Sequence, residues 1–272
     1  MSDDFPPTSN DQPTPQPPSD VPPSDDDDNS QVVEIERVVK LLECGKIKRG
    51  MGRLRWSTNY TTVVQVKDDE LETLAIYKPR SGERSLWDFP DGTLCHREVA
   101  AFVLSEALDW HIIPPTVLRQ DGPDGAGSLQ LFIQHDAEIN YFSLDDSFVP
   151  QLLMMALFDC LVNNADRKGG HVLVDAQGKI WGIDHGICFH PYPKLRTVIW
   201  DFAGQPIPDE LLKDVSRVVE TICDPSHELT VALQKLLEPD EIEAFNKRAN
   251  RLMTIKKYPH PGPGPSYPWP PV

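Results

Sequence analysis

Apolar and polar residues follow two different periods along this chain, and these periods predict which segments are helices and which are strands. Apolar positions that recur every three or four residues are typical of helices, whereas short β-branched runs between polar breaks are typical of strands. We expect strands at residues 61–66, 74–77 and 128–134. Helical periodicity is found at residues 32–42, 93–108, 150–161, 208–222, 226–237 and 239–252. A small mixed part followed by a mostly helical part indicates an α+β fold class.

A hairpin is predicted around Gly178, because a polar break that contains this glycine separates two β-rich runs. If Gln177 and Gly178 form a two-residue turn, His171 lies directly opposite Asp184 at the open end of the hairpin. Asp166 precedes His171 by five residues, so three ionisable groups gather at that end. An ordinary surface hairpin with polar ends would have the same spacing, so the spacing alone leaves a catalytic and a structural interpretation open.

The charge of the chain is unevenly distributed, and this changes the partners to expect. The formal net charge is −16, and residues 1–30 contain eight Asp but no Lys or Arg. Residues 1–31 are therefore expected to be a disordered, acidic, Pro-rich leader. The rest of the chain is only mildly acidic, which argues against nucleic acid as the main ligand, because phosphate contacts need clustered Lys and Arg.

Cysteine content and hydropathy bear on the compartment. The five Cys are scattered and form no CxxC pair, so free thiols and a cytoplasmic location are expected. No stretch approaches the roughly 18 apolar residues of a membrane-spanning helix, and the N-terminus lacks the pattern of a signal peptide. Residues 255–272 form a Pro-rich tail, for which a passive role is favoured over that of a ligand for a polyproline-binding partner.

Polar groups occur in the order that a phosphoryl-transfer site needs: a loop over the phosphates, a Lys held by a Glu, a carboxylate at the acceptor and a metal-binding pair. In chain order these groups are the loop at residues 50–60, Lys78, Glu98, Asp166, His171 and Asp184. Between the two parts of the chain, the apolar run Leu131, Phe132 and Ile133 is suited to presenting its backbone to adenine. This ordered set favours a kinase-like interpretation over a plain hairpin.

At these positions the sequence resembles the phosphatidylinositol 3-/4-kinase-like family, and most closely the type II phosphatidylinositol 4-kinases. The resemblance extends over roughly residues 53–207. The matching stretches are Ser57-Thr58-Asn59-Tyr60, Ala75-Ile76-Tyr77-Lys78-Pro79, the helix from Glu98, residues 127–133, Asn164-Ala165-Asp166-Arg167 and Ile183-Asp184-His185-Gly186. The resemblance implies a bilobal, atypical protein-kinase-like fold, with a small mixed β lobe at residues 32–134 and a larger, mostly helical lobe at residues 135–254.

The resemblance also implies ATP as a cofactor and assigns nucleotide-binding roles. Lys78 would contact the α- and β-phosphates, and Glu98 would hold Lys78 in place. The other residues on the nucleotide side are Ser57 and Asn59 in the phosphate loop and Leu131, Phe132 and Ile133 in the hinge.

Catalytic and metal-binding roles follow from the same resemblance. Asp166 would orient or deprotonate the acceptor hydroxyl, and Asp184 would hold Mg²⁺ between the phosphates. Arg167 would either stabilise the phosphate or Asp166, or act as a structural arginine of the catalytic loop. His171 stands where the family has a metal-binding Asn. Because imidazole suits Mn²⁺ better than Mg²⁺, we expect activity with Mn²⁺ at least as high as with Mg²⁺.

Two departures from the family concern the acceptor. The Cys-rich palmitoylated segment of the eukaryotic type II enzymes is absent from this sequence, and no basic amphipathic stretch for anionic lipid is evident. A protein or small-molecule hydroxyl is therefore favoured over an inositol lipid. Residues 80–90 have no counterpart in the lipid kinases, and Trp87 and Phe89 are expected to pack on the small lobe.

The leading interpretation is an ATP-dependent phosphotransferase that moves the γ-phosphate to a hydroxyl group. A nucleotide-binding pseudokinase or sensor is one alternative, which only the His171 departure favours. An enzyme that transfers AMP in the same cleft is another.

Overall fold

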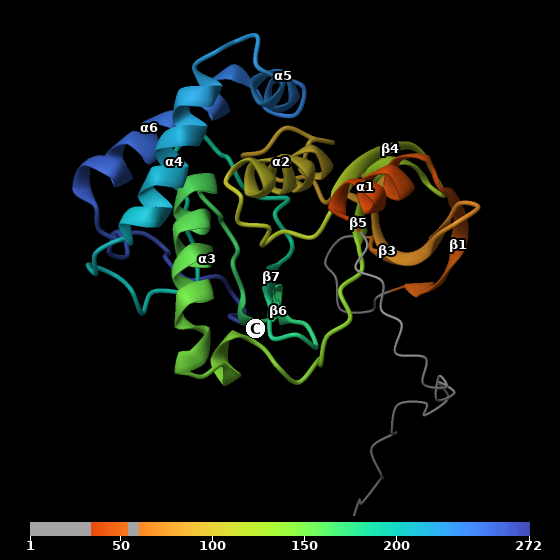
Figure 1. The fold of residues 1–272 in the computed structure, drawn as a ribbon, viewed down its shortest axis with the longest axis horizontal. Helices are drawn as coiled ribbons and strands as arrows, with labels where there is room; N and C mark the ends of the chain where they lie inside the picture. Colours follow the sequence, from red (N-terminus) through yellow and green to blue (C-terminus); the bar gives the residue numbers. More distant parts are fainter. Residues whose placement is uncertain (1–33, 54–59) are drawn as a thin grey trace, which may run out of the picture. The chain divides into compact units, whose positions relative to one another are not determined.

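A five-stranded antiparallel sheet and one helix form the smaller lobe (Figure 1). The computed structural model describes residues 34–53 and 60–272, so the predicted leader and the loop residues Ser57 and Asn59 lie outside the described residues. The strand order is β1-β2-β3-β5-β4. The elements of this lobe are α1 (Ile35–Cys44), β1 (Lys46–Arg53), β2 (Thr62–Lys67), β3 (Glu72–Pro79), β4 (Thr116–Gly122) and β5 (Gly125–Leu131).

The three predicted strands correspond to β2, β3 and β5, whereas β1 and β4 were not predicted. Strand β1 reads KIKRGMGR, in which cations and glycines replace the apolar alternation of a typical strand. Strand β4 extends to Gly122. Residues 121–127 are rich in Gly and Asp, a composition that is typical of a loop. Both strands nevertheless form, because each is hydrogen-bonded to a neighbouring strand: β1 pairs with β2, and β4 pairs with β5.

The larger lobe is built from helices around one small hairpin (Figure 1). Its elements are α2 (Leu94–Ala107), α3 (Val149–Val162), α4 (Asp209–Ile222), α5 (Glu228–Gln234), α6 (Pro239–Ile255), β6 (Val172–Val174) and β7 (Ile180–Gly182). Short 3₁₀ turns lie at Arg80–Gly82, Tyr141–Ser143, Asp146–Phe148 and Gly169–His171. The predicted helices are all present, with ends that differ by a few residues.

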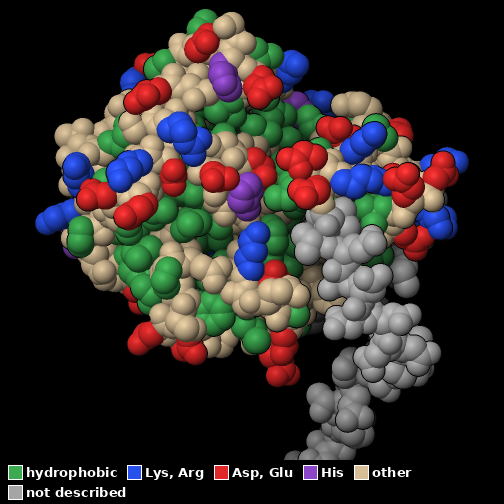
Figure 2. Space-filling view, viewed as in Figure 1, with side chains coloured by type: hydrophobic (Ala, Val, Ile, Leu, Met, Phe, Trp, Pro, Cys, Tyr) green, Lys and Arg blue, Asp and Glu red, His purple; other side chains and the backbone are tan. Residues whose placement is uncertain are grey.

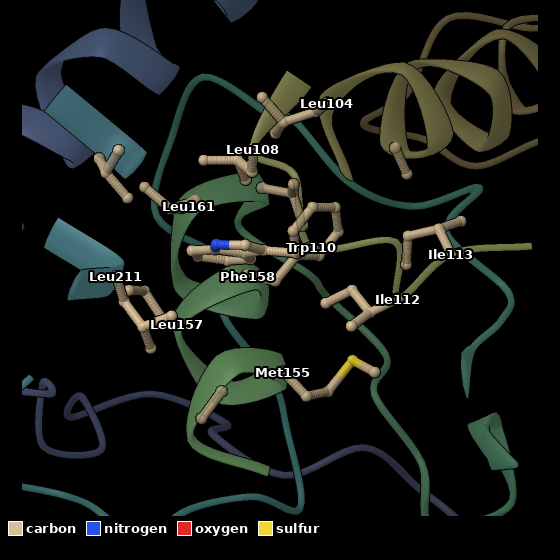
Figure 3. Close-up of a cluster of buried hydrophobic side chains, with 14 of the residues drawn as sticks. Leu104, Leu108, Trp110, Ile112, Ile113, Met155, Leu157, Phe158, Leu161 and Leu211 are labelled. Atoms are coloured by element: carbon tan, nitrogen blue, oxygen red, sulfur yellow. The ribbon is translucent and has the colours of Figure 1, made fainter. Parts of the chain in front are cut away.

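The core of the larger lobe forms where α3 meets the chain that follows α2 (Figure 3). The rings of Trp110 and Phe158 pack edge to face, with centroids 6.4 Å apart. The indole N–H of Trp110 donates to Oδ2 of Asp214 at 3.0 Å, which satisfies its polar atom at the edge of the core. Burial of this apolar cluster fixes α3, and α3 leads directly into the segment that begins at Asn163.

Helix α2 packs against both lobes, between the sheet and α5 (Figure 1). Its buried residues, such as Ala100 and Leu104, pack into the core of the larger lobe, and the helix also contacts β4 and β5. The boundary at residue 134 stays a prediction. Arg97 on α2 is 2% exposed and pairs with Glu241 on α6, and its Nε donates to the carbonyl of Cys188 at 3.1 Å. The helix is thereby tied to the larger lobe by charge as well as by apolar contact.

One expectation about the aromatic residues needs correction, and the position of the tail is new information. Phe89 is buried as expected, but it contacts Arg97 and His190 of the larger lobe. Trp87 is 93% exposed and does not pack on the smaller lobe. The Pro-rich tail is not a free appendage, because Tyr258 is buried and its hydroxyl donates to the carbonyl of Leu153 at 2.9 Å.

Two surface properties complete the description of the fold. Among the helices that the structure describes, none has the length and apolar character needed to cross a membrane. On the face drawn in Figure 2, Lys and Arg are interspersed with Asp and Glu and form no continuous basic stripe. This face therefore lacks the clustered positive charge that phosphate backbones require.

The Arg97–Glu241 pair makes a prediction about stability. Arg97→Met leaves the Glu241 carboxylate buried without a cation, and breaking a buried pair in this way costs about 3–5 kcal/mol. We expect a loss of this size in the free energy of unfolding measured by urea denaturation. The matched control is Lys247→Met, which removes an exposed pair with Glu243 and should cost less than about 0.5 kcal/mol.

A double variant, Arg97→Met with Glu241→Met, should recover part of the lost stability, because the orphaned charge is removed. A loss of less than about 1 kcal/mol in Arg97→Met alone would show that the pair does not hold α2 to the larger lobe.

Candidate active site

Groups from three separate parts of the chain meet around the amine of Lys78, near the end of β3. Nζ of Lys78 donates one hydrogen bond to Oδ1 of Asp184 at 2.8 Å and another to Glu98 on α2. The second carboxylate oxygen of Glu98 accepts the backbone N–H of His185 at 2.9 Å. Glu98 is only 3% exposed, so these two donors balance its charge in the interior. The sheet, α2 and the segment after β7 are thus joined at one point.

Mutual attraction keeps the central pair of this group ionised. Burial alone would lower the pKa of Lys78, but the carboxylates of Asp184 and Glu98 hold that pKa above its usual value. The Lys78 ammonium in turn keeps the pKa of Asp184 well below its usual range. At neutral pH a fixed cation therefore stands beside a fixed anion, which are the charges needed for phosphate and for a divalent metal.

The hairpin of β6 and β7 has a register one residue away from the predicted one. The N–H of Ile183 donates to the carbonyl of His171 at 3.0 Å, so His171 lies opposite Ile183 and not opposite Asp184. The cause is the turn, which consists of residues 176–178 rather than two residues. Gly178 has a φ of +78°, as is usual for the last position of a three-residue hairpin loop.

His171 and Asp184 are neighbours even in this register. Nε2 of His171 lies 3.3 Å from Oδ2 of Asp184, whose backbone has a left-handed φ of +63°. Burial lowers the pKa of His171 to about 4, so the imidazole is neutral at pH 7. A neutral imidazole keeps a lone pair that can bind a metal ion. The predicted metal pair is therefore in contact, although not through the predicted pairing.

This imidazole and this carboxylate fit a divalent cation such as Mg²⁺ or Mn²⁺. The described residues contain no group of three or more His, Cys, Asp or Glu side chains that could hold a metal. Nucleotide phosphates and water would supply the remaining ligands, as is usual for Mg²⁺ in phosphoryl-transfer sites. The side chain of Asp184 is 43% exposed and thus open to such ligands.

Asp166 follows α3 in a short loop that exposes part of its carboxylate. Its backbone N–H donates to Oδ1 of Asn164 at 3.0 Å, which holds the loop in a tight turn. Burial raises the pKa of the Asp166 carboxyl to about 6, against the lowering effect of Lys168, whose Nζ is 3.5 Å from Oδ2. A carboxylate with a pKa near neutrality is well matched to accepting a proton from a hydroxyl group.

Arg167 is fully buried and anchors the loop that carries Asp166. Its guanidinium makes hydrogen bonds of 3.0–3.1 Å to both carboxylate oxygens of Asp159. Its other N–H groups donate to the carbonyls of His171 and Ile183, both at 3.0 Å, and to Nε2 of His185 at 2.6 Å. Of the two roles that the sequence left open for Arg167, this geometry favours support of the loop over contact with phosphate.

Asp159, the partner of Arg167, was not predicted as a site residue. It is completely buried in α3 and also accepts hydrogen bonds from Nδ2 of Asn164 at 2.9 Å and from Oγ1 of Thr197 at 3.3 Å. The available signal was a single acid inside the apolar stripe of the predicted helix. Fully buried carboxylates are rare unless they are paired, so this Asp indicated a buried cation nearby.

The three hinge residues link the sheet to the segment that leads to α3 (Figure 1). The N–H of Leu131 donates to the carbonyl of Pro115 at 2.8 Å, and the N–H of Phe132 to that of Leu74 at 3.0 Å. Ile133 is 9% exposed. Their backbone thus continues β5, which lies between β4 and β3 in the sheet, and β3 carries Lys78 near its end.

Residues 80–90 connect β3 to α2 and also reach the larger lobe. The carboxylate of Glu83 accepts the first two N–H groups of α2 at 3.1 and 2.8 Å, and so caps the helix that carries Glu98. Nε2 of His190 lies 3.0 Å from the carbonyl of Asp88, whose carboxylate pairs with Lys194. Besides the packing of Phe89, this segment therefore positions α2, a role that the sequence did not indicate.

Comparison with known proteins agrees with this arrangement. The family model "Phosphatidylinositol 3- and 4-kinase" matches residues 26–243. Protein Rv2133c of Mycobacterium tuberculosis is 36% identical over 255 residues, which cover 81% of this chain and 90% of that protein. Phosphatidylinositol 4-kinase gamma 4 of Oryza sativa subsp. japonica is 31% identical over 110 residues, which cover 34% of this chain and 20% of that protein.

A solved structure of the Golgi casein kinase with Mn/ADP bound has a TM-score of 0.51 and 14% sequence identity, and covers 81% of this chain and 75% of that one. At this identity the similarity shows the fold alone, which is the α+β, bilobal fold of the atypical kinases. The matched family range contains Lys78, Glu98, Asp166 and Asp184. This chain therefore belongs to the phosphatidylinositol 3- and 4-kinase family, as its sequence motifs predicted.

Proposed function

We propose that this chain transfers the γ-phosphate of ATP to a hydroxyl group, with Mg²⁺ or Mn²⁺ as the metal ion. The observation that supports this most strongly is the pairing of Lys78 with both Glu98 and Asp184. A buried cation held by a helix carboxylate is what phosphate binding requires, and a partly exposed carboxylate beside it is what metal binding requires. A structural role alone would not need Asp184 to be exposed.

Lys78 binds the phosphates, and Glu98 keeps its amine in place while the nucleotide enters. His171 and Asp184 would hold the metal ion, which when bound neutralises charge on the phosphates. Nζ of Lys78 is 2.8 Å from Oδ1 of Asp184. When nucleotide and metal bind, the phosphates therefore take the place of Asp184 beside Lys78, and the metal takes the place of Lys78 beside Asp184. Glu98 and Arg167 are buried and hydrogen-bonded on several sides, which provides a preorganised frame for the chemistry.

Asp166 receives the proton of the acceptor hydroxyl. Its carboxylate is largely ionised at pH 7, because its pKa of about 6 lies below neutrality. The Lys168 ammonium, 3.5 Å away, favours this ionised form. The hydroxyl oxygen then attacks the γ-phosphorus, and the bond from that phosphorus to the β–γ bridging oxygen breaks, so that ADP leaves.

The acceptor is a hydroxyl of a protein or of a small molecule, with an inositol lipid ranked below these. The basis is the sequence, which lacks a basic amphipathic stretch for anionic lipid. The similarity to a casein kinase structure and to plant phosphatidylinositol 4-kinases leaves both a protein and a lipid acceptor compatible with the fold.

ATP labelled at either the γ- or the α-phosphate shows which group is transferred. We expect label from γ-labelled ATP, and none from α-labelled ATP, in acceptors from a cell extract. Asp166→Ala should reduce transfer at least about 100-fold, because the proton acceptor is lost. It should leave ATP binding within about twofold, because Lys78 and Glu98 are untouched.

The control for this experiment is Asp69→Ala, which removes an exposed carboxylate in the loop between β2 and β3 and should transfer at the wild-type rate. Label from the α-phosphate would replace the proposal by AMP transfer. Nucleotide binding with no transfer of either label would replace it by a nucleotide sensor.

The choice of metal tests His171. Wild type should transfer phosphate at least as fast with Mn²⁺ as with Mg²⁺, because imidazole binds Mn²⁺ more readily. His171→Asn should move the ratio of the two rates toward Mg²⁺ by about tenfold, since an amide oxygen replaces the imidazole. Equal and full activity with Mg²⁺ in both proteins would mean that His171 is not a metal ligand.

Desolvation of Asp166 should be measurable as a cost in stability. Its pKa is raised from an ordinary 3.8 to about 6, so the folded state resists ionisation and wild type loses stability as the pH rises from about 4 to about 6. Asp166→Asn has no such cost. We expect its Tm to exceed that of wild type by a few °C at pH 7.5 and by almost nothing at pH 4.

The control here is Asp69→Asn, which removes an exposed carboxylate and should leave the Tm at pH 7.5 close to that of wild type. An equal or lower Tm for Asp166→Asn at pH 7.5 would show that the carboxylate is not desolvated in the folded protein.

A further inference from the structure

The Pro-rich tail runs along the larger lobe and contacts the loop that carries the catalytic groups. The carbonyl of Ser266 accepts the N–H of Thr197 at 3.1 Å and the indole N–H of Trp200 at 3.0 Å. Five residues further on, the carbonyl of Pro271 accepts the N–H of Gly169 at 2.7 Å. Residues 266–272, which we call the tail segment, therefore join two parts of the chain that surround Asp166.

The tail segment is docked in place. Upstream, residues 206 and 257 form an antiparallel bridge, and the ring of Tyr258 packs against Phe202. Within the segment, Pro268 is buried. A proline-rich chain loses little conformational freedom when it is fixed in an extended form, so these few contacts suffice to hold it.

Gly169, which receives the last of these contacts, is itself buried and tightly enclosed. A Cβ at this position would lie 2.7 Å from a ring carbon of Phe142, so a larger residue would have to displace that ring. The ring of Phe142 and the carbonyl of Pro271 thus enclose the same backbone unit. Gly169 lies three residues after Asp166 and two before His171, and the 3₁₀ turn Gly169–His171 begins there.

The tail segment does not close the catalytic site. The side chains of Asp166 and Asp184 are 27% and 43% exposed while the segment is in place. The segment accepts hydrogen bonds from two backbone N–H groups and one indole of the larger lobe. The hydroxyl of Ser266 donates to the carbonyls of Gly262 and Gly264, and none of these bonds goes to the carboxylates of the site. An inhibitory plug would cover these carboxylates, so the contacts favour support of the loop.

We propose that the tail segment positions the catalytic loop, with the carbonyl of Pro271 fixing the backbone at Gly169 between Asp166 and His171. This inference rests on the proposed phosphotransfer reaction. Without that carbonyl, the N–H of Gly169 has to turn toward water, and the loop gains alternative positions. A displacement of about 1 Å at a catalytic group is enough to slow a reaction about 100-fold. Nucleotide affinity should not change, because Lys78 and Glu98 lie on β3 and α2.

Paired truncations isolate this carbonyl. A chain that ends at Pro270 loses it, whereas a chain that ends at Pro271 keeps an oxygen at the same position, and Pro271→Ala keeps the carbonyl and loses the ring. We expect the first to lower kcat for γ-phosphate transfer at least about tenfold, with KM for ATP within twofold of wild type. The other two should stay within twofold of wild type in both constants.

Hydrogen exchange gives a readout that does not depend on activity. The amide of Gly169 should exchange at least about tenfold faster in the chain that ends at Pro270 than in the one that ends at Pro271. A chain that ends at Gly264 should regain kcat and slow exchange at Gly169 when a synthetic peptide of residues 265–272 is added. Rescue in trans separates positioning from a general loss of folding.

Equal exchange at Gly169 in the two truncated chains would overturn the inference, and so would an equal kcat or a rise in kcat when the carbonyl is lost. A wild-type chain that transfers no γ-phosphate, but shows the expected difference in exchange at Gly169, would contradict the proposed function and leave the contact itself established.

Discussion

The site depends on one buried ion pair, Asp159 with Arg167. Two charges without exposed surface are costly unless their hydrogen-bonding groups are paired. Arg167 meets this condition by binding Asp159, the carbonyls of His171 and Ile183, and the ring of His185. The hydrogen bonds that offset the cost of burying these charges also bring α3, the catalytic loop and the β6–β7 hairpin together. Asp166 directly precedes Arg167 in the sequence, so the Arg167–Asp159 ion pair fixes the backbone position of Asp166.

The nucleotide side of the site is organised by a second constraint, the burial of Glu98. Its two oxygens are satisfied by Lys78 and by the backbone of His185, so the smaller lobe and the metal-binding segment are held by one side chain. Arg97, the preceding residue of α2, pairs with Glu241 in the opposite direction. Adjacent residues of one helix thus fix both lobes.

Much of the site could be predicted from the sequence, because Lys78, Asp166 and Asp184 lie in short linear motifs with strong local signals. The hairpin register could not, since one extra loop residue shifts every pair, and a left-handed glycine such as Gly178 suits the last position of a two-residue turn and of a three-residue turn alike. Asp159 was not predicted: the lone acid inside an apolar helix indicated a buried cation, but the sequence did not identify Arg167 as its partner. The docking of the tail depends on backbone carbonyls, which carry no sequence signal. Strand β1 similarly depends on its pairing partner.

The central claim is that Lys78, Asp184 and His171 form the place where nucleotide phosphates and a divalent metal meet. Crystals soaked with Mn²⁺ and a non-hydrolysable ATP analogue would test this most directly, through anomalous diffraction at the manganese edge. The account predicts one strong manganese peak bonded to Asp184 and to Nε2 of His171, with phosphate oxygens between that peak and Lys78. A manganese peak or triphosphate located away from these three residues would contradict it.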